Sequence, residues 1–354
     1  MKHAWRALLL LLPCYLVAHP YSRPERETTG QVIDETSKRI TPDAGPSVNG
    51  GIDVFITADF LYWTGRMDGL SYVTAGLGNN ITSVSRGKAY FPDWEWDAGF
   101  KVGLGHNLPH DGWDISTQYT WFHTSATDYT KGTTLDPNWD ISNLGTFITS
   151  SDLPGSVSRA DATWKLKYNV VDLELGRNYF ISHYLSLRPH FGFKVSWQDI
   201  DYRVHYQVEL SDQESHLRMK NDTDFWGIGL RSGLDTAWHI NPVFSVYGDF
   251  ALSALWSQYE VKRRDTRSDV DSNTSIITYD TEKDFHTLKP VLELSIGLRG
   301  EWWCSDNRYH FLVQAGWEEQ LWINHNQFVK MHFAQSAHGD LILQGFTLKG
   351  RFDF

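Results

Sequence analysis

Apolar and polar residues alternate strictly along one stretch of the chain. Trp113, Ile115, Tyr119 and Trp121 fall on one face, and polar residues such as Asp114 fall on the other. A period of two predicts a two-faced β-strand. At a rise of about 3.3 Å per residue and a tilt near 40°, this stretch spans roughly 20 Å along a membrane normal, close to the apolar band of about 25 Å in transmembrane barrels.

Similar alternating stretches recur along the chain. They lie at 52–63, 97–106, 164–180, 185–197, 226–238, 244–256, 288–302, 309–317 and 346–354. Successive two-faced segments separated by polar connections predict an all-β antiparallel fold. The apolar phase slips at Val170 and Val171, and this slip predicts a β-bulge.

The connections between these stretches alternate in length. Four are tight, at 107–111, 181–183, 239–242 and 304–307. Five are long, at about 64–95, 123–161, 208–224, 258–286 and 323–339. Short periplasmic turns and long outer loops produce this order in a barrel. The sequence therefore predicts one antiparallel transmembrane β-barrel of ten strands with periplasmic N- and C-termini. A further hairpin within the first long loop, formed by 71–74 and 88–91, would raise the number of strands to twelve.

The N-terminus has the features of a secretory signal peptide. Lys2 and Arg6 precede an apolar run at 7–12, and the small Ala18 follows a turn-prone proline, which is the order found at cleaved signals. The polar, proline-rich part that follows is typical of a flexible segment. The predicted divisions are a signal peptide at 1–18, a flexible periplasmic segment at 19–50 and a barrel at 51–354.

Composition and charge narrow the class of protein. Aromatic residues make up 14% of the chain, yet no run after the N-terminus approaches the roughly 18 apolar residues of a membrane helix. A helical membrane protein is therefore excluded. The net charge of -11 and the lack of a basic cluster argue against nucleic-acid binding. No motif predicts a cofactor, because the short glycine pattern at 103–105 precedes no helix.

Charged residues lie on the polar face of the predicted strands. The basic set is Lys101, Arg188, Arg231, Arg299 and Arg351. Acidic residues on the same face are Asp114, Glu174, Asp235, Asp249, Glu293, Glu301 and Asp353. One interpretation is a charged constriction that sets ion selectivity, with Asp235 and Glu301 as its acidic members. The other is an ion-paired network that fills the lumen, because only barrels of about 16 to 18 strands hold a wide channel.

Tryptophan residues fall near the ends of the alternating stretches. The predicted aromatic girdle consists of Trp113, Trp121, Trp197, Trp238, Trp256, Trp302 and Trp317. The indole ring is apolar with one polar N–H, so it settles at the headgroup level of a bilayer. The pairs Trp94/Trp96 and Trp302/Trp303 also suit sugar stacking, but the girdle is the preferred interpretation.

Histidine and cysteine residues predict neither a metal site nor an intramolecular disulfide. His106 and His110 flank a turn, but no further ligand completes a site, so no metal is predicted. If the signal peptide is removed, Cys304 is the one cysteine left. An intermolecular disulfide through Cys304 is a hypothesis.

The last strand and several motifs resemble known outer-membrane proteins. The chain ends in alternating apolar residues that close on Phe354, a feature by which barrel assembly machinery recognises its substrates. The motifs are Ala58-Asp59-Phe60-Leu61-Tyr62-Trp63, Trp94 to Gly105, His110-Asp111-Gly112-Trp113-Asp114, Tyr119 to His123, Leu175 to Phe180, Leu187 to Gly192 and Phe225 to Leu230. Together they resemble the Legionella-type pore-forming outer-membrane protein family, which also occurs in chlamydia-related bacteria. The resemblance implies a barrel in the outer membrane that forms a pore, and it supplies no catalytic residues.

Three functions are compatible with these features. The preferred one is passive passage of ions and small polar solutes, with outer-membrane lipid as the surrounding partner and a homo-oligomer as an open question. The first alternative is an occluded barrel that acts as an adhesin or structural surface antigen. The second is a hydrolase with a site in the outer loops, for which Asp93, His123 and Asp128 are the nearest candidates; we expect no enzyme activity.

Overall fold

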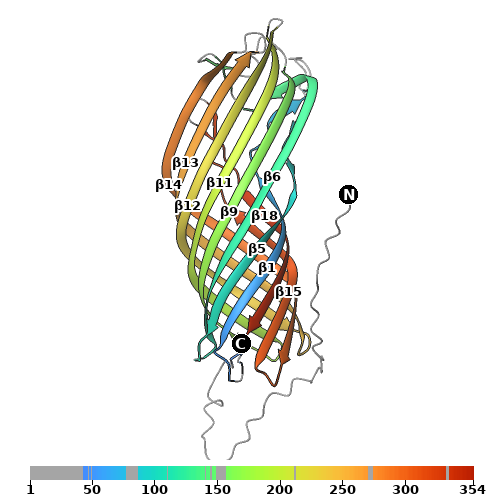
Figure 1. Cartoon of the computed structure of the whole chain (residues 1–354), viewed down its shortest axis with the longest axis vertical. Helices are drawn as coiled ribbons and strands as arrows, with labels where there is room; N and C mark the ends of the chain where they lie inside the picture. Colours follow the sequence, from blue (N-terminus) through green and yellow to red (C-terminus); the bar gives the residue numbers. More distant parts are fainter. Residues whose placement is uncertain are drawn as a thin grey trace, which may run out of the picture. The chain divides into compact units, whose positions relative to one another are not determined.

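A computed structural model shows that the barrel is closed by ten antiparallel strands (Figure 1). It describes residues 43–46, 48, 50–76, 87–109, 111–139, 141–143, 146–148, 157–210, 213–269, 274–331 and 335–354. In spatial order the wall strands are β1 (Val54–Met67), β5 (Trp96–Asn107), β6 (Trp113–Pro137), β9 (Val157–Arg177), β11 (Leu185–Leu210), β12 (Gln213–His239), β13 (Phe244–Asp269), β14 (Thr274–Cys304), β15 (Tyr309–Trp322) and β18 (Leu341–Asp353). Pairing of β18 with β1 closes the sheet. The predicted ten-stranded all-β barrel is confirmed.

Short strands lie outside the ten-stranded circuit. They are β2 (Val73–Ala75), β3 (Lys88–Tyr90), β4 (Asp93–Trp94), β7 (Ile141–Asn143), β8 (Thr146–Ile148), β10 (Tyr179–Phe180), β16 (Val329–Met331) and β17 (Gln335–Ser336). The hairpin considered at 71–74 and 88–91 exists as β2 and β3, but β2 pairs with the far end of β6. It therefore adds no strands to the wall. Among the described residues there is no helix long and apolar enough to cross a membrane.

The tight turns lie where the sequence predicts them, but two of the predicted long loops are wrong, and a third, at 123–161, is shorter than predicted because β6 runs to Pro137 and β9 begins at Val157. Strands β11 and β12 run through 208–224, and β13 and β14 run through most of 258–286. These extensions were missed because charged residues alternate there with small or apolar ones, so that a strongly polar stretch was taken for a loop. We call the end with the four tight turns the turn end and the opposite end the loop end.

The predicted bulge at Val170 and Val171 is wrong. Both residues keep continuous register with β6 and β11, and Val170 is buried while Val171 is partly exposed. At this position the apolar residues of the strand instead change from one face of the sheet to the other, which we call the polarity reversal. On the turn-end side of it the apolar residues of β9 face outward, as Leu173 does, and on the loop-end side they face inward, as Trp164 does.

The same reversal occurs on neighbouring strands. On β11, Phe193 and Trp197 are exposed on the outer face, while Asp199 takes the next outward position. The inward positions change in the opposite sense, from Lys194 to the fully buried Tyr202. The barrel is thus apolar outside and charged inside near the turn end, and charged outside and apolar inside near the loop end.

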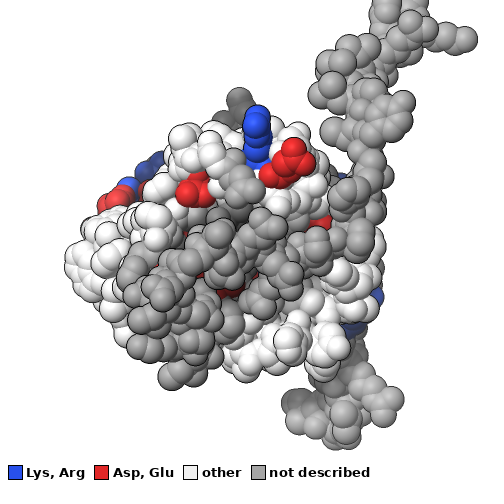
Figure 2. Space-filling model, turned by 90° about the horizontal axis from the view of Figure 1, so that it is seen from below, with Lys and Arg blue, Asp and Glu red and all other residues white. Residues whose placement is uncertain are grey.

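Outward tryptophans mark the level of the reversal. This tryptophan row consists of Trp96, Trp121, Trp197, Trp226, Trp256 and Trp317, and several of its rings contact each other or a neighbouring aromatic ring. From Trp226 to Trp238 near the turn end, the outer face of β12 spans about 30 Å along the axis at the usual rise and tilt, which matches the hydrocarbon core of a bilayer. Seen from the turn end, most of the described surface carries no charged residue (Figure 2).

The wall is unequal in height. Strands β1, β5, β15 and β18 end soon after the tryptophan row, whereas β6, β9 and β11 to β14 continue far beyond it and reach the loop end (Figure 1). We call this extension the tall wall. Its inner face is mostly apolar and fully buried, as at Tyr206 and Val261, because the chain at 68–73 and 323–330 packs against it.

A short piece of the N-terminal segment lies against the turn end. The backbone N–H of Ala44 donates to the carbonyl of Asn178 over 3.3 Å, and the Asn107 amide donates to the carbonyl of Pro46 over 3.3 Å. The predicted signal peptide at 1–18 lies outside the described residues, as does most of the segment predicted to be flexible.

Two aspartates of the tall wall predict a pH-dependent stability. Asp201 and Asp222 are direct cross-strand partners on the outer face, and the hydrogen bond between them, with partial burial, raises the pKa of Asp201 to about 6. The folded state therefore holds this proton more tightly than the unfolded chain, so stability falls as pH rises through about 6.

We expect Asp201→Asn to raise the free energy of unfolding at about pH 8, by less than about 1 kcal/mol for a partly exposed pair, and to have little effect at about pH 3, where the folded and the unfolded state both hold the proton. Asp280→Asn is the control. It removes the ion pair of Arg264 with Asp280 at 2.9 Å, so it should not raise the free energy of unfolding at about pH 8. Equal effects of Asp201→Asn at both pH values would contradict the shared-proton account.

Candidate functional site: the charged lumen and its aromatic septum

The predicted lumen residues all occupy inward positions of the wall. These are Lys101, Arg188, Arg231, Asp235, Arg299, Glu301 and Arg351. Sequence analysis did not single out three further buried members, Lys194, Asp172 and Glu318. We define the charged section as Lys101, Arg188, Lys194, Arg231, Asp114, Asp172, Glu174, Asp235, Glu293 and Glu318; it lies between the turn end and the tryptophan row.

Arg188 joins three strands inside the charged section. Its guanidinium donates to Asp114 on β6 at 2.6 Å, to Asp235 on β12 at 2.8 Å and to Glu174 on β9 at 3.1 Å. His190 lies 3.4 Å from the Asp235 carboxylate. A guanidinium has five N–H donors in a fixed plane, so one arginine holds several carboxylates that would otherwise repel each other.

Arg231 and Lys194 form the next layer towards the tryptophan row. Arg231 pairs with Glu174 and donates to Glu293 over 2.9 Å. The Lys194 ammonium lies 2.8 Å from Asp172 and 3.0 Å from Glu293. The section thus has the geometry of an ion-paired network that spans the lumen.

Two further ionic groups lie nearest the turn end. Arg299 lies 3.6 Å from Glu301, whose side chain is 26% exposed. Arg351 donates to Asp353 over 2.6 Å, and the His310 ring lies 2.8 Å from the same carboxylate. The pair of Arg299 with Glu301 is thus partly exposed, whereas the Asp353 side chain is fully buried.

Aromatic side chains close the lumen at the level of the tryptophan row. We define the septum as Trp63, Phe122, Trp164, Tyr168, Phe225 and Trp322, all inward-facing and at most 3% exposed. The Tyr168 hydroxyl on β9 donates to Gln320 on β15 over 2.6 Å, and its ring packs edge-on against Trp322. These two strands lie on opposite sides of the circuit, so the hydrogen bond crosses the lumen.

The chain after β15 turns into the barrel and adds to the septum. His325 is fully buried, lies 2.8 Å from the Tyr259 hydroxyl and 3.0 Å from the Gln198 amide oxygen. Two wall cations hold this inner loop (residues 323–330) by its backbone. Lys289 donates to the carbonyls of residues 323 and 324, and Arg263 to those of 329 and 330.

The septum was missed because its aromatic residues take inward positions, where the predicted strands at 52–63 and 164–180 were expected to carry polar residues, and the inner face stays apolar beyond it. Tyr202 and Tyr259 lie beyond the tryptophan row, where outward neighbours are charged. The signal that was available is the unbroken period of two through the phase change at Val170 and Val171. Inner-loop residues such as His325 carry no such signal, because a loop has no period.

The seven girdle tryptophans lie on the outer face. Trp197, Trp238, Trp256 and Trp317 are 43 to 67% exposed, and Trp113, Trp121 and Trp302 are intermediate. Within the pairs considered for sugar stacking, Trp94 packs edge-on against septum residue Trp164, and Trp303 lies against His310. Contact of the outer rings with lipid stays a prediction.

The cysteine and histidine predictions concern the turn end. Cys304 closes β14 and is a free, half-buried thiol, and its intermolecular disulfide remains a hypothesis. His106 lies 3.1 Å from the Asp53 carbonyl, and His110 lies outside the described residues.

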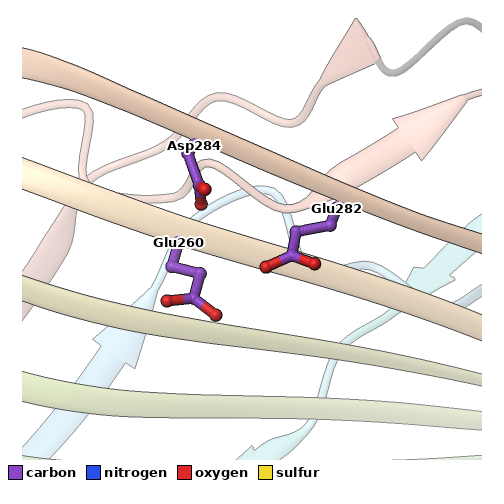
Figure 3. Close-up of side chains that lie close together, drawn as sticks. All are labelled: Glu260, Glu282 and Asp284. Carbon is purple, nitrogen blue, oxygen red and sulfur yellow. The ribbon is translucent and has the colours of Figure 1, made fainter.

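Three carboxylates gather on the outer face of the tall wall. The oxygens of Glu260, Glu282 and Asp284 all lie within 4.8 Å of one another (Figure 3). Lys262 pairs with Glu260 and lies 3.4 Å from Glu282. The cluster therefore has its own cation, and we assign it no metal.

The residues considered for hydrolysis do not form one site. His123 stacks on Trp121 on the outer face of β6, with ring centroids 4.3 Å apart. Asp128 accepts a hydrogen bond of 2.9 Å from Tyr72, whose side chain is buried inside the tall wall. His123 and Asp128 therefore lie on opposite faces of β6.

The sequence pattern of one known family matches residues 46–354, which include the whole barrel-forming part of the chain. That family is described as the Legionella pneumophila major outer membrane protein precursor. The chain belongs to this family. As a member of this family it resides in the outer membrane, and the resemblance predicted from the motifs is confirmed. A search of curated proteins finds no match.

Solved structures of outer-membrane barrels are similar only in general architecture. The outer membrane protease OmpT from Escherichia coli is 12% identical, with 85% of this chain and 96% of that chain covered and a TM-score of 0.37. A FadL homologue from Pseudomonas aeruginosa is 8% identical (85% and 89% covered, TM-score 0.27), and an anion-selective porin from Comamonas acidovorans is 5% identical (85% and 98% covered, TM-score 0.12). Similarities this low carry no argument about activity.

Removal of Arg188 tests the cohesion of the charged section. We expect Arg188→Met to destabilise the barrel by about 3–5 kcal/mol, because Asp114, Glu174 and Asp235 lose their shared cation in a buried site. The measurement is the denaturant midpoint of the folded barrel in detergent. Arg299→Met is the matched control and should cost less than half as much, since its carboxylate neighbour is more distant and more hydrated. An equal loss of stability in both variants would contradict a special contribution of the Arg188 ion pairs.

Proposed function

We propose that this outer-membrane barrel is a pore for cations and small polar solutes, seen with its septum closed. The turn end and both termini of the barrel then face the periplasm, and the tall wall faces outward. The proposal rests on one contrast. The same barrel is filled with aromatic side chains at the septum, yet it is filled with charges at membrane depth. Buried ion pairs seldom stabilise a fold more than apolar packing does, so the charged section serves a purpose other than filling.

The charge balance of the lumen favours cations. Between the turn end and the septum, the described inward-facing cations are Lys101, Arg188, Lys194, Arg231, Arg299, Lys349 and Arg351. The described inward-facing carboxylates are more numerous: Asp59, Asp114, Asp172, Glu174, Asp235, Asp249, Glu293, Glu301, Glu318 and Asp353. A net negative pore wall attracts cations and repels anions.

A permanently closed surface barrel is the second candidate. The hydrogen bond from Tyr168 to Gln320 across the lumen supports it, as does the inner loop held by Lys289 and Arg263. Opening would have to break these contacts. The two candidates differ in whether any conducting state exists.

The septum predicts the effect of one double substitution on conductance. Single-channel recording of the refolded protein in planar bilayers should show rare openings for the wild type. Tyr168→Ser with Trp322→Ala should open far more often, because the contact across the lumen is removed. Trp317→Ala is the matched control, since it removes an outward tryptophan of the same strand. A septum variant that folds but stays silent would establish the permanently closed barrel.

The charge balance predicts the sign of the selectivity. Reversal potentials in a KCl gradient should show K⁺ more permeant than Cl⁻, and Asp249→Asn with Glu301→Gln should reduce that preference. These two carboxylates are chosen because they lie outside the Arg188 and Arg231 pairs. Glu319→Gln removes one charge from the outer face and should leave the preference unchanged. Preference for Cl⁻ in the wild type would contradict the proposal.

A further inference from the structure

The inner loop carries a fully buried histidine, His325. Its ring packs against the septum residues Phe225 and Trp322, with ring centroids 4.8 and 5.4 Å apart. Further along the loop, Phe328 is 1% exposed and stacks on Tyr202 of β11. The inner loop therefore contributes to the closure of the lumen, and its release would take the His325 ring away from two members of the septum.

A chain of hydrogen bonds fixes the protonation state of the His325 ring. The Ser196 hydroxyl donates to the carbonyl of Asn169 over 3.2 Å, so its oxygen accepts from the Gln198 amide N–H over 3.0 Å. The Gln198 amide oxygen therefore faces His325 and accepts from its Nε2–H over 3.0 Å. A neutral ring with its proton on Nε2 has an acceptor at Nδ1, and the Tyr259 hydroxyl donates to it over 2.8 Å. Both ring nitrogens are thus satisfied when His325 is neutral.

A second proton on the ring has no suitable partner while the inner loop is held. It would place an Nδ1–H against the Tyr259 hydroxyl, which could accept only if its own hydrogen gave up its partner. The charged group nearest to this site is Lys289 on β14, whose ammonium lies 5.2 Å from the centre of the Tyr259 ring. Burial and then the charge of Lys289 lower the pKa of His325 well below its ordinary value, and no described carboxylate opposes them.

The other groups that hold the inner loop do not oppose a proton in this way. Lys289 and Arg263 hold backbone carbonyls as cations, so acid leaves these contacts unchanged. The Asp340 carboxylate accepts the backbone N–H of Asn324 over 2.6 Å. His338 is exposed, and its Nδ1 lies 3.1 Å from the Asn324 amide oxygen, so its charged form keeps this hydrogen bond.

The direction of the pH effect follows from where the proton binds more tightly. A histidine in water takes up its proton with a pKa of about 6.5, whereas the held loop resists that proton. The held loop is therefore most stable above about pH 6.5, and its stability falls as pH falls below that value. Each further pH unit raises the ratio of released to held loop by up to about tenfold.

We propose that protonation of His325 releases the inner loop, so that acid opens the septum. Trp322 directly precedes the loop and loses the His325 ring as a packing partner when the loop leaves. The opening of a pore rests on the proposed function. Release of the loop does not depend on conductance, so the two can fail separately.

The test compares the reactivity of two single cysteines in the detergent-solubilised full chain with Cys304→Ser. Gln327→Cys places a thiol at a loop position that is 7% exposed, and Ile323→Cys provides a reference position that is 41% exposed. The reagent is a dipyridyl disulfide, which also reacts with thiols in acid. The rate at 327 divided by the rate at 323 should rise at least about tenfold between about pH 7.5 and pH 5, with a limit of about 30-fold for one proton.

Variants of the titratable groups identify the proton. His325→Gln cannot take up a proton and should remove the rise. The matched controls are His338→Gln, which removes the other histidine beside the loop, and Asp340→Asn, which keeps an acceptor for the Asn324 N–H; both should retain it. A flat ratio in the parent protein, an equal rise in His325→Gln, or loss of the rise in either control would overturn the inference. If His325→Gln does not fold, His325→Asn takes its place.

Single-channel recording over the same pH range separates the two proposals. Openings that become at least about tenfold more frequent in acid, and not in His325→Gln, are expected. Release of the loop without any openings would contradict the pore and support the proton-linked release. Openings that are independent of pH, with position 327 protected throughout, would support the pore and overturn the release.

Discussion

Every feature of this barrel depends on the closure of its sheet. Backbone N–H and C=O groups have no partner in hydrocarbon, so a sheet can cross a membrane only without free edges. Here the pairing of β18 with β1 removes the last edge, from Phe55 opposite Asp353 to Met67 opposite Leu341. Closure also fixes which side chains point inward, because alternate residues of each strand must take opposite faces.

Closure does not determine which side chains fill the lumen, and the lumen is filled differently at two levels of the barrel. Near the turn end the outer face is apolar, and the lumen holds carboxylates and cations that form ion pairs across strands. At the level of the tryptophan row the aromatic septum fills the lumen in place of charged residues. Beyond this level the outer face is charged. One strand pattern with a reversed polarity therefore builds a membrane-spanning part and a part that stands above the membrane.

Much of the fold was predictable from the period of two. The ten strands, the tight turns and the inward positions of residues such as Arg188 and Arg231 follow from alternation alone. The extensions of β11 to β14 did not, because charged residues alternate there with small or apolar ones and hydropathy averages to a loop-like value. The phase slip at Val170 and Val171 was seen but assigned to a bulge, since a change of environment along one strand gives the same local pattern.

The partners inside the lumen were less predictable. A sequence shows that Arg188 faces inward but not that Asp114, Glu174 and Asp235 converge on it, because that depends on the stagger between strands. The contact of Tyr168 with Gln320 is still less predictable from the sequence, because it joins strands on opposite sides of the barrel. The inner loop has no period at all, and its burial follows only once the apolar inner face of the tall wall is known.

Cysteine accessibility along β11 tests the polarity reversal most directly. Single cysteines are introduced at Val195, Ser196, His205 and Tyr206 with Cys304 replaced by serine, and intact cells are treated with a membrane-impermeant maleimide. We predict rapid labelling at position 205 and protection at 206, while a lipid-soluble maleimide labels the position at 195 but not the one at 196. Rapid labelling at 206 by the impermeant reagent, or none at 195 by the lipid-soluble one, would contradict the account.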